Sequence, residues 1–153
     1  GKETEKEMGG SEYYNALNIK GGAVPKSDTK ILKNSIKAIL ELNNKELIES
    51  CHDISEGGIA VCLSEMAIGG DLGCEVELKD ISKDLRSDFK LFSESNTRWI
   101  IEVKKEKIKE FEKTLEKSKI FFKKIGNIVD KKIIIKDQNK TIINQKISSL
   151  RDI

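Results

Sequence analysis

A short stretch near the middle of the chain gathers the residue types that could do acid–base or nucleophilic chemistry. It reads SCHDISEGGIAVCLSEMA over residues 50–67 and holds the only histidine of the chain, His52, between Cys51 and Asp53. If this segment is a strand, successive side chains point to opposite faces. Cys51 and His52 then cannot pair as nucleophile and base, and Asp53 cannot orient His52. We retain His52 and Asp53 as auxiliary candidates, with a structural histidine as the alternative, and predict no catalytic residue.

Two adjacent glycines follow, Gly57 and Gly58, at the start of a helical pattern. Glycine within a helix costs up to about 1 kcal/mol relative to alanine, so the turn must gain something from lacking Cβ atoms. Either backbone N–H groups at the helix N-terminus face an anion such as phosphate, or the helix packs closely on a sheet without a ligand. The negative charge of the neighbouring Glu56 counts against a tightly bound phosphate. Both interpretations stay open.

A second candidate is the polar loop within LFSESNTRW, residues 91–99. Its donors and acceptors suit a ribose or a phosphate group. The alternative is a capped turn whose side chains satisfy their own backbone. The candidate ligand contacts in this loop are Ser93, Glu94, Ser95, Asn96 and Arg98.

Composition narrows the function classes. The chain has 153 residues, and its 28 basic and 26 acidic residues leave a net charge of +2, so no strong attraction to nucleic acid or membranes is expected. The three cysteines have no C-x-x-C spacing, which predicts neither a disulfide framework nor a metal site. No apolar stretch approaches the roughly 20 residues that span a bilayer. We therefore expect a cytoplasmic protein, and the missing initiator methionine suggests a fragment of a longer one.

The pattern of apolar residues predicts alternating helices and strands. Residues 8–23 are expected to form short extended pieces joined by turns. Helices are predicted from a cap at Ser27 or Asp28 to Asn43–Asn44, briefly through 47–48, and over 59–67, 81–91 and 105–117. The first of these helices is expected to bury an apolar stripe made of Ile31, Leu32, Ile36, Ile39 and Leu40. Strands are predicted at 51–55, 74–78, 98–103, 119–129, 131–136 and 140–147. This order favours an α+β fold, an α/β sandwich with a mixed or antiparallel sheet covered by helices.

Three motifs carry a resemblance to a known family. MGGSEYY at 8–14, CHDISEGGIAVCLSEMAIGGDLGCEVEL at 51–78 and LFSESNTRWIIEV at 91–103 resemble the C-terminal part of phosphoribosylformylglycinamidine synthase. The wider superfamily includes aminoimidazole ribonucleotide synthetase. The resemblance implies a C-terminal α/β domain over residues 25–153, preceded by the tail of an ATP-binding domain and a connector over residues 1–24.

The resemblance also implies a chemistry for the whole enzyme. Members convert formylglycinamide ribonucleotide, ATP and glutamine into formylglycinamidine ribonucleotide, ADP, phosphate and glutamate, with Mg²⁺ as a cofactor. Implied partners are the rest of the synthetase subunit, a glutaminase subunit and a small accessory subunit. The catalytic groups and most ligands of ATP and Mg²⁺ would lie upstream of this chain, so the isolated chain should be inactive and hold neither.

One loop has a counterpart within the family. Glu94-Ser95-Asn96 resembles a Glu-Ser-Gln triplet that touches substrate in the first copy of the duplicated enzyme, and the second copy is a pseudo-active site. The loop is therefore either a relic or a minor phosphate contact. The alternative functions are a free-standing nucleotide- or phosphate-binding module, and the equivalent domain of another superfamily member.

Overall fold

The computed structural model describes residues 1–79, 81–82 and 84–151. Helices and strands alternate along the chain, as the apolar pattern predicts. The helices are α1 (Glu12–Ala16), α2 (Thr29–Asn44), α3 (Gly58–Gly70), α4 (Ser87–Phe92), the 3₁₀ turn η1 (Lys105–Lys107), α5 (Ile108–Lys117) and α6 (Ser148–Arg151). The strands are β1 (Ser50–Asp53), β2 (Gly73–Glu77), β3 (Trp99–Glu102), β4 (Gly126–Val129), β5 (Lys132–Asp137) and β6 (Lys140–Lys146).

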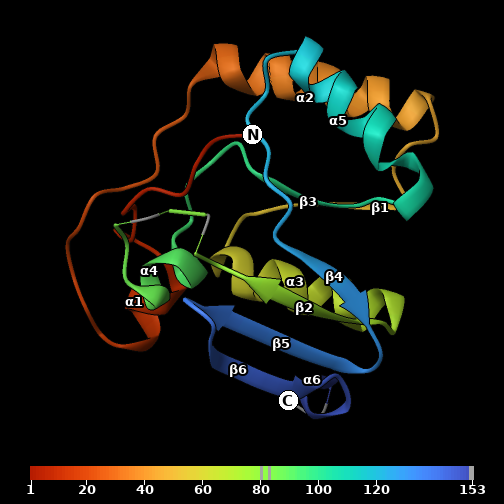
Figure 1. Cartoon of the computed structure of the whole chain (residues 1–153). Helices are drawn as coiled ribbons and strands as arrows, with labels where there is room; N and C mark the ends of the chain where they lie inside the picture. Colours follow the sequence, from red (N-terminus) through yellow and green to blue (C-terminus); the bar gives the residue numbers. More distant parts are fainter. Residues whose placement is uncertain (80, 83, 152–153) are drawn as a thin grey trace.

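The strands form two separate sheets (Figure 1). The larger has the order β4-β2-β5-β6, in which β2 runs parallel to β5 and antiparallel to β4, while β5 and β6 are antiparallel. In the smaller, β1 pairs antiparallel with β3, placing His52 opposite Ile100. The fold is therefore α+β with a mixed sheet, which confirms the predicted class.

Two hydrophobic clusters hold these layers together. The larger joins the apolar face of α3 to β2 and β5, with Ile59, Leu63, Val76, Ile133 and Ile135 among its buried members. The smaller lies between α2 and α5, which Figure 1 shows side by side, and is built from Ala38, Leu42, Leu47 and Leu115. The 93–98 loop lies next to the larger cluster, since Leu91 just before it is a member. No helix in the described part of the chain is long and apolar enough to cross a membrane.

Helix α2 begins and ends as predicted but buries a different face. The Asp28 side chain accepts hydrogen bonds from the N–H groups of Lys30 and Ile31, at 2.9 Å each. Small residues at 35 and 38 are fully buried, and Ile36 and Leu40 on the predicted apolar stripe are exposed at 44% and 56%. The helix is thus rotated so that Ser35, Ala38 and Leu42, rather than Ile36 and Leu40, lie on its buried face.

Three other expectations were wrong in detail. No helix forms at residues 47–48, where Glu46 at φ +56° has already ended the α2 region. The helix predicted over 81–91 begins only at Ser87, and residue 83 lies outside the described residues. Residues 12–16 are helical rather than extended, because the Ser11 hydroxyl caps the turn by accepting from the Tyr14 N–H at 3.3 Å.

A buried ion pair fixes α4 to the large sheet. Lys90 Nζ lies 2.8 Å from Asp137 Oδ1, and both side chains are buried. The Ser87 hydroxyl donates to the other carboxylate oxygen of Asp137 at 2.7 Å. Because β5 ends at Asp137, this contact sets the position of α4, and hence of the loop that follows it, against the sheet.

Candidate functional site

The glycine pair forms a tight backbone contact at the start of α3. Gly57 and Gly58 have φ of +71° and +65°, the left-handed region that glycine adopts without strain. A Cβ atom on Gly58 would lie 2.5 Å from the carbonyl oxygen of Leu91 and 2.8 Å from that of Ser93. The close approach expected of this turn is therefore present. Its partner is the backbone at the end of α4 rather than the sheet.

The 93–98 loop is joined to the N-terminal segment, residues 1–11, by hydrogen bonds. Ser93 and Ser95 are fully buried, and the Ser93 hydroxyl donates to the Glu5 carbonyl at 2.6 Å. The Ser95 hydroxyl accepts from the Glu5 N–H at 3.1 Å, and the Ser93 hydroxyl accepts from the Glu7 N–H at 3.3 Å. Both serine hydroxyls thus serve the protein's own backbone.

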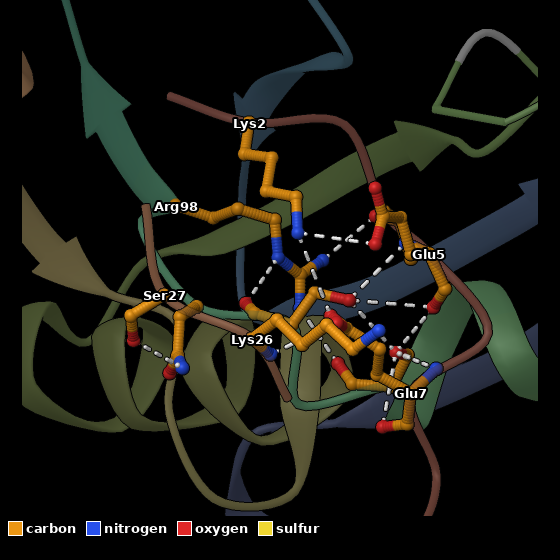
Figure 2. Close-up of polar contacts among 10 residues, drawn as sticks. Lys2, Glu5, Glu7, Lys26, Ser27 and Arg98 are labelled. Carbon is orange, nitrogen blue, oxygen red and sulfur yellow. Dashed lines mark hydrogen bonds and ion pairs between the residues drawn. The ribbon is translucent and has the colours of Figure 1, made fainter. Parts of the chain in front are cut away.

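Arg98 lies at the centre of this junction, as Figure 2 shows. Its guanidinium donates to the carbonyl oxygens of Ser95 and Ser93, at 2.7 and 2.6 Å, and to the Thr4 hydroxyl at 2.7 Å. Burial lowers the pKa of Arg98 to about 10, against the opposing effect of nearby Glu7, so it stays charged at neutral pH. The side chain is only 4% exposed. Its hydrogen bonds hold the loop and the N-terminal segment together.

Glu94 supplies the anion at the start of α3. Its Oε1 atom accepts from the Gly57 N–H at 2.8 Å and from the Glu12 N–H, at the start of α1, at 2.9 Å. One carboxylate oxygen therefore caps two helices, whose N-termini carry partial positive charge. The N–H group of Gly57, considered above as a phosphate donor, already has an anionic partner from the same chain.

Removing this carboxylate should weaken both caps. Glu94→Ala leaves the N–H groups of Gly57 and Glu12 without their acceptor, and we expect a loss of about 1–2 kcal/mol in the free energy of unfolding. Glu94→Gln keeps an acceptor oxygen and should lose less than half as much. Urea denaturation followed by circular dichroism measures both variants. Equal stability of Glu94→Ala and the wild type would contradict the double-cap role.

The remaining loop contact joins a second part of the N-terminal region. Asn96 Nδ2 donates to the Ser27 hydroxyl at 2.9 Å, and the neighbouring Lys26 N–H donates to Glu7 Oε1 at 2.9 Å. Glu7 is buried, and its Oε2 atom has no hydrogen-bond partner within the described ranges, with Lys2 Nζ 3.8 Å away (Figure 2). Sequence reasoning missed Thr4, Glu5 and Glu7 as partners of this loop. The one sequence signal that could have drawn attention to these residues was the MGGSEYY motif, which begins directly after Glu7.

The auxiliary candidates lie apart from this loop network. His52 Nδ1 lies 2.7 Å from the backbone oxygen of Asp53 and 3.8 Å from its carboxylate, too far for a side-chain hydrogen bond. Its Nε2 atom lies 3.6 Å from the Glu65 carboxylate on α3. The side chain of Asp53 is largely exposed. These contacts place His52 on the surface between β1 and α3, and its functional role stays a prediction.

The three cysteines differ sharply in accessibility. Cys51 is exposed, and Cys62 and Cys74 are buried. Burial raises the pKa of Cys62 to about 12 and of Cys74 to about 11, and burial and Asp53 together raise that of Cys51. Only Cys51 should therefore react with a disulfide reagent such as DTNB at pH 8 in the folded protein, and more slowly than free cysteine, because the thiolate is the reactive form.

A thiol titration tests this ordering. The folded chain should release one equivalent of reporter, and the chain in denaturant should release three, matching its cysteine content. Cys51→Ser serves as the control and should abolish the reaction of the folded protein. Rapid reaction of a second thiol before unfolding would contradict the packing of Cys62 or Cys74.

The donors in the loop do not fit the phosphates of ATP as they stand. The hydroxyls of Ser93 and Ser95, the guanidinium of Arg98 and the N–H of Gly57 are each hydrogen-bonded within the chain. Among residues 1–79, 81–82 and 84–151, no group of three or more His, Cys, Asp or Glu side chains is placed to hold a metal ion. A phosphate group bound by these donors would need their present contacts to be rearranged.

Comparison with curated proteins places the chain within much longer relatives. It is 35% identical over 153 residues to phosphoribosylformylglycinamidine synthase subunit PurL of Thermococcus sibiricus, with 97% of this chain matched to 20% of that protein. The PurL subunit of Thermoanaerobacter pseudethanolicus is 38% identical over 151 residues, with 98% of this chain and 20% of that protein matched. The chain thus spans about one fifth of the length of these relatives.

Solved structures share the fold at lower sequence identity. The Thermotoga maritima PurL complexed with FGAR superposes with a TM-score of 0.77 and 22% identity, over 84% of this chain and 22% of that one. The PurLQS structure from the same organism gives a TM-score of 0.74 over 93% of this chain and 24% of that one. A family model described as AIR synthase related protein, C-terminal domain, matches residues 3–137. The chain therefore belongs to the family of AIR synthase related C-terminal domains.

Proposed function

We propose that this chain is the C-terminal α/β domain of a phosphoribosylformylglycinamidine synthase subunit, and that it supplies framework rather than catalytic groups. The observation that carries the proposal is the end-to-end match to PurL relatives at 35–38% identity. The loop chemistry supports the framework role, because the candidate ligand contacts serve the chain's own backbone and helix ends. The parent enzyme would use formylglycinamide ribonucleotide, ATP and glutamine, with Mg²⁺ held by groups outside this chain.

The proposal extends to organisation and partners. Residues 1–24 would lead in from an ATP-binding domain, and residues 25–153 would form the C-terminal domain proper. The hydrogen bonds from the N-terminal segment to the 93–98 loop would then fix the angle at which the preceding domain meets this one. The partners would be the rest of the synthetase subunit, a glutaminase subunit and a small accessory subunit, in the cytoplasm.

A chimera tests the family role directly. Replacing the corresponding fifth of the Thermococcus sibiricus PurL subunit with this chain should preserve ATP-dependent amidation of formylglycinamide ribonucleotide, with ammonia as nitrogen donor. The isolated chain should show no turnover in the same assay. A chimera that melts cooperatively at the parent's temperature but is inactive would contradict the proposal, and so would turnover by the isolated chain.

Calorimetry separates the framework role from a free-standing binding module. Titration of the isolated chain with ATP, ADP or formylglycinamide ribonucleotide should give no heat of binding that depends on the 93–98 loop, because the loop donors are already paired. Any heat that is observed should therefore be unchanged in Asn96→Ala. Micromolar binding that weakens on Asn96→Ala would support the module instead. Asn96 suits this test because its side-chain bond to Ser27 is at the exposed edge of the loop.

A further inference from the structure

A cleft of about 410 Å³ lies at the end of the large sheet away from the 93–98 loop. The end of β5 at Asp137 contacts α4, so the start of β5 at Lys132 lies at the opposite end, beside α6 (Figure 1). The cleft is bounded by the turn before β5, by the end of β6 and by α6. Nothing in the framework role described above uses it.

The charges around this cleft do not balance. Its basic side chains are Lys131, Lys132, Lys146 and Arg151, and its carboxylates are Asp71 and Asp130. Asp71 is shared between Lys131 and Arg151, the latter at 3.1 Å. Within the part of the chain that the structure describes, no ion pair includes Lys132 or Lys146. Among the residues that the structure describes, four cations therefore line the cleft with two carboxylates, in a protein whose overall charge is only +2.

Lys132 and Lys146 lie directly opposite each other on neighbouring strands of the large sheet. Lys132 on β5 is the register partner of Lys146 on β6, and the two strands are antiparallel. Residues directly opposite in such a pair have Cβ atoms about 4.5–5.5 Å apart on the same face, and like charges there are destabilising. A bound anion between the two ammonium groups would turn this repulsion into attraction.

The walls of the cleft are held by the backbone. The Ile147 N–H donates to the Lys131 carbonyl at 3.1 Å, which joins the end of β6 to the turn before β5. Lys131 Nζ also donates to the Asp71 carbonyl at 3.1 Å, and Arg151 donates to the Ile68 carbonyl at 2.9 Å. The backbone next to Lys132 and Lys146 is thus held in place, and the side chains of Lys131 and Arg151 are already positioned, which lowers the entropic cost of binding.

We propose that this cleft binds a small, multiply charged phosphate compound, with Lys132 and Lys146 as its main contacts. The volume is within the range of small-molecule sites, about 300–1,000 Å³. A site of this size, in a chain of nearly balanced charge, fits a compact anion rather than a nucleic acid. The proposal goes beyond the framework role, and either can fail without the other.

The test is a titration of the 153-residue chain with inorganic pyrophosphate, followed by ¹H–¹⁵N spectra at constant ionic strength. Shifts should saturate and be confined to residues near 130–132 and 146–151. The double variant Lys132→Gln/Lys146→Gln should bind roughly tenfold more weakly, because two charge contacts are lost. Lys33→Gln/Lys37→Gln on α2, which removes the same charge elsewhere, should bind like the wild type. A parallel titration with ADP shows whether a nucleoside adds affinity.

Stability without ligand gives a second readout. Removing the repulsion between Lys132 and Lys146 should leave the double variant at least as stable as the wild type, which a structural role for the two lysines would not allow. At the same concentration, pyrophosphate should raise the melting temperature of the wild type and of the α2 control more than that of the cleft variant. Absent or non-saturating shifts, equal affinity in all three proteins, or a destabilised cleft variant would each overturn the proposal.

Discussion

Replacing Gly58 with alanine is expected to lower the free energy of unfolding by about 3 kcal/mol. The left-handed backbone at φ +65° costs a residue with a Cβ atom about 1–2 kcal/mol. The new atom would also lie 2.5 Å and 2.8 Å from the carbonyl oxygens of Leu91 and Ser93. Neither oxygen can move freely, because both belong to the backbone between α4 and the 93–98 loop. For a chain of this size the melting temperature should fall by roughly 10 °C.

The neighbouring glycine provides a matched control. Gly57 has nearly the same backbone conformation, at φ +71°, and the atoms nearest to a Cβ atom there would be Cγ2 and Cβ of the Val61 side chain, at 2.2 and 2.8 Å. A rotamer change of Val61 moves its Cγ2 atom away but not its Cβ atom, so Gly57→Ala should cost somewhat more than the conformational term of about 1–2 kcal/mol. It should still cost less than Gly58→Ala, because the contact is with one exposed side chain rather than with two backbone oxygens. Gly69→Ala within α3, where no atom lies within 4 Å, should be neutral or stabilising. Equal losses for Gly57→Ala and Gly58→Ala would contradict the close-approach explanation.

Local signals in the sequence were sufficient for much of the fold. The Asp28 cap, the helix leaving Gly58 and the alternating strand at 73–77 depend on interactions within a few residues, and each is present. The order of helices and strands indicated a mixed or antiparallel sheet covered by helices, and the larger sheet is mixed. These features can be predicted because propensity, capping and periodicity act over one or two turns.

Contacts between residues far apart in the sequence could not be predicted from these local signals. Which face of α2 is buried depends on its packing against α5, about 70 residues later, so Ile36 and Leu40 were assigned to the wrong environment. The partners of Ser93 in the N-terminal segment, Glu5 and Glu7, are separated from it by more than 80 residues. The sequence correctly marked the 93–98 loop as rich in hydrogen-bond donors and acceptors that make specific contacts. Periodicity alone could not show whether its donors face a ligand or the chain.

Whether a loop donor contacts a ligand or the chain itself should have its largest measurable consequence at Arg98. Arg98→Ala removes three donors and leaves the carbonyl oxygens of Ser93 and Ser95 and the Thr4 hydroxyl without that partner in a buried site. Each unsatisfied buried acceptor costs about 1–3 kcal/mol, and we expect a total loss of about 4 kcal/mol in the free energy of unfolding. Arg98→Lys keeps the charge, but one ammonium group cannot reach all three acceptors. We expect it to recover less than half of the loss.

Hydrogen exchange distinguishes this structural role from a ligand contact. The backbone N–H groups of Glu5 and Glu7 donate to the Ser95 and Ser93 hydroxyls, so their exchange should accelerate in Arg98→Lys more than that of the core residue Ile133. The reason is that Arg98 fixes both the loop, through Ser93 and Ser95, and the N-terminal segment. An exposed phosphate contact would instead leave stability and exchange unchanged while weakening ligand binding. That second result would show that the loop belongs to a working site rather than to the framework.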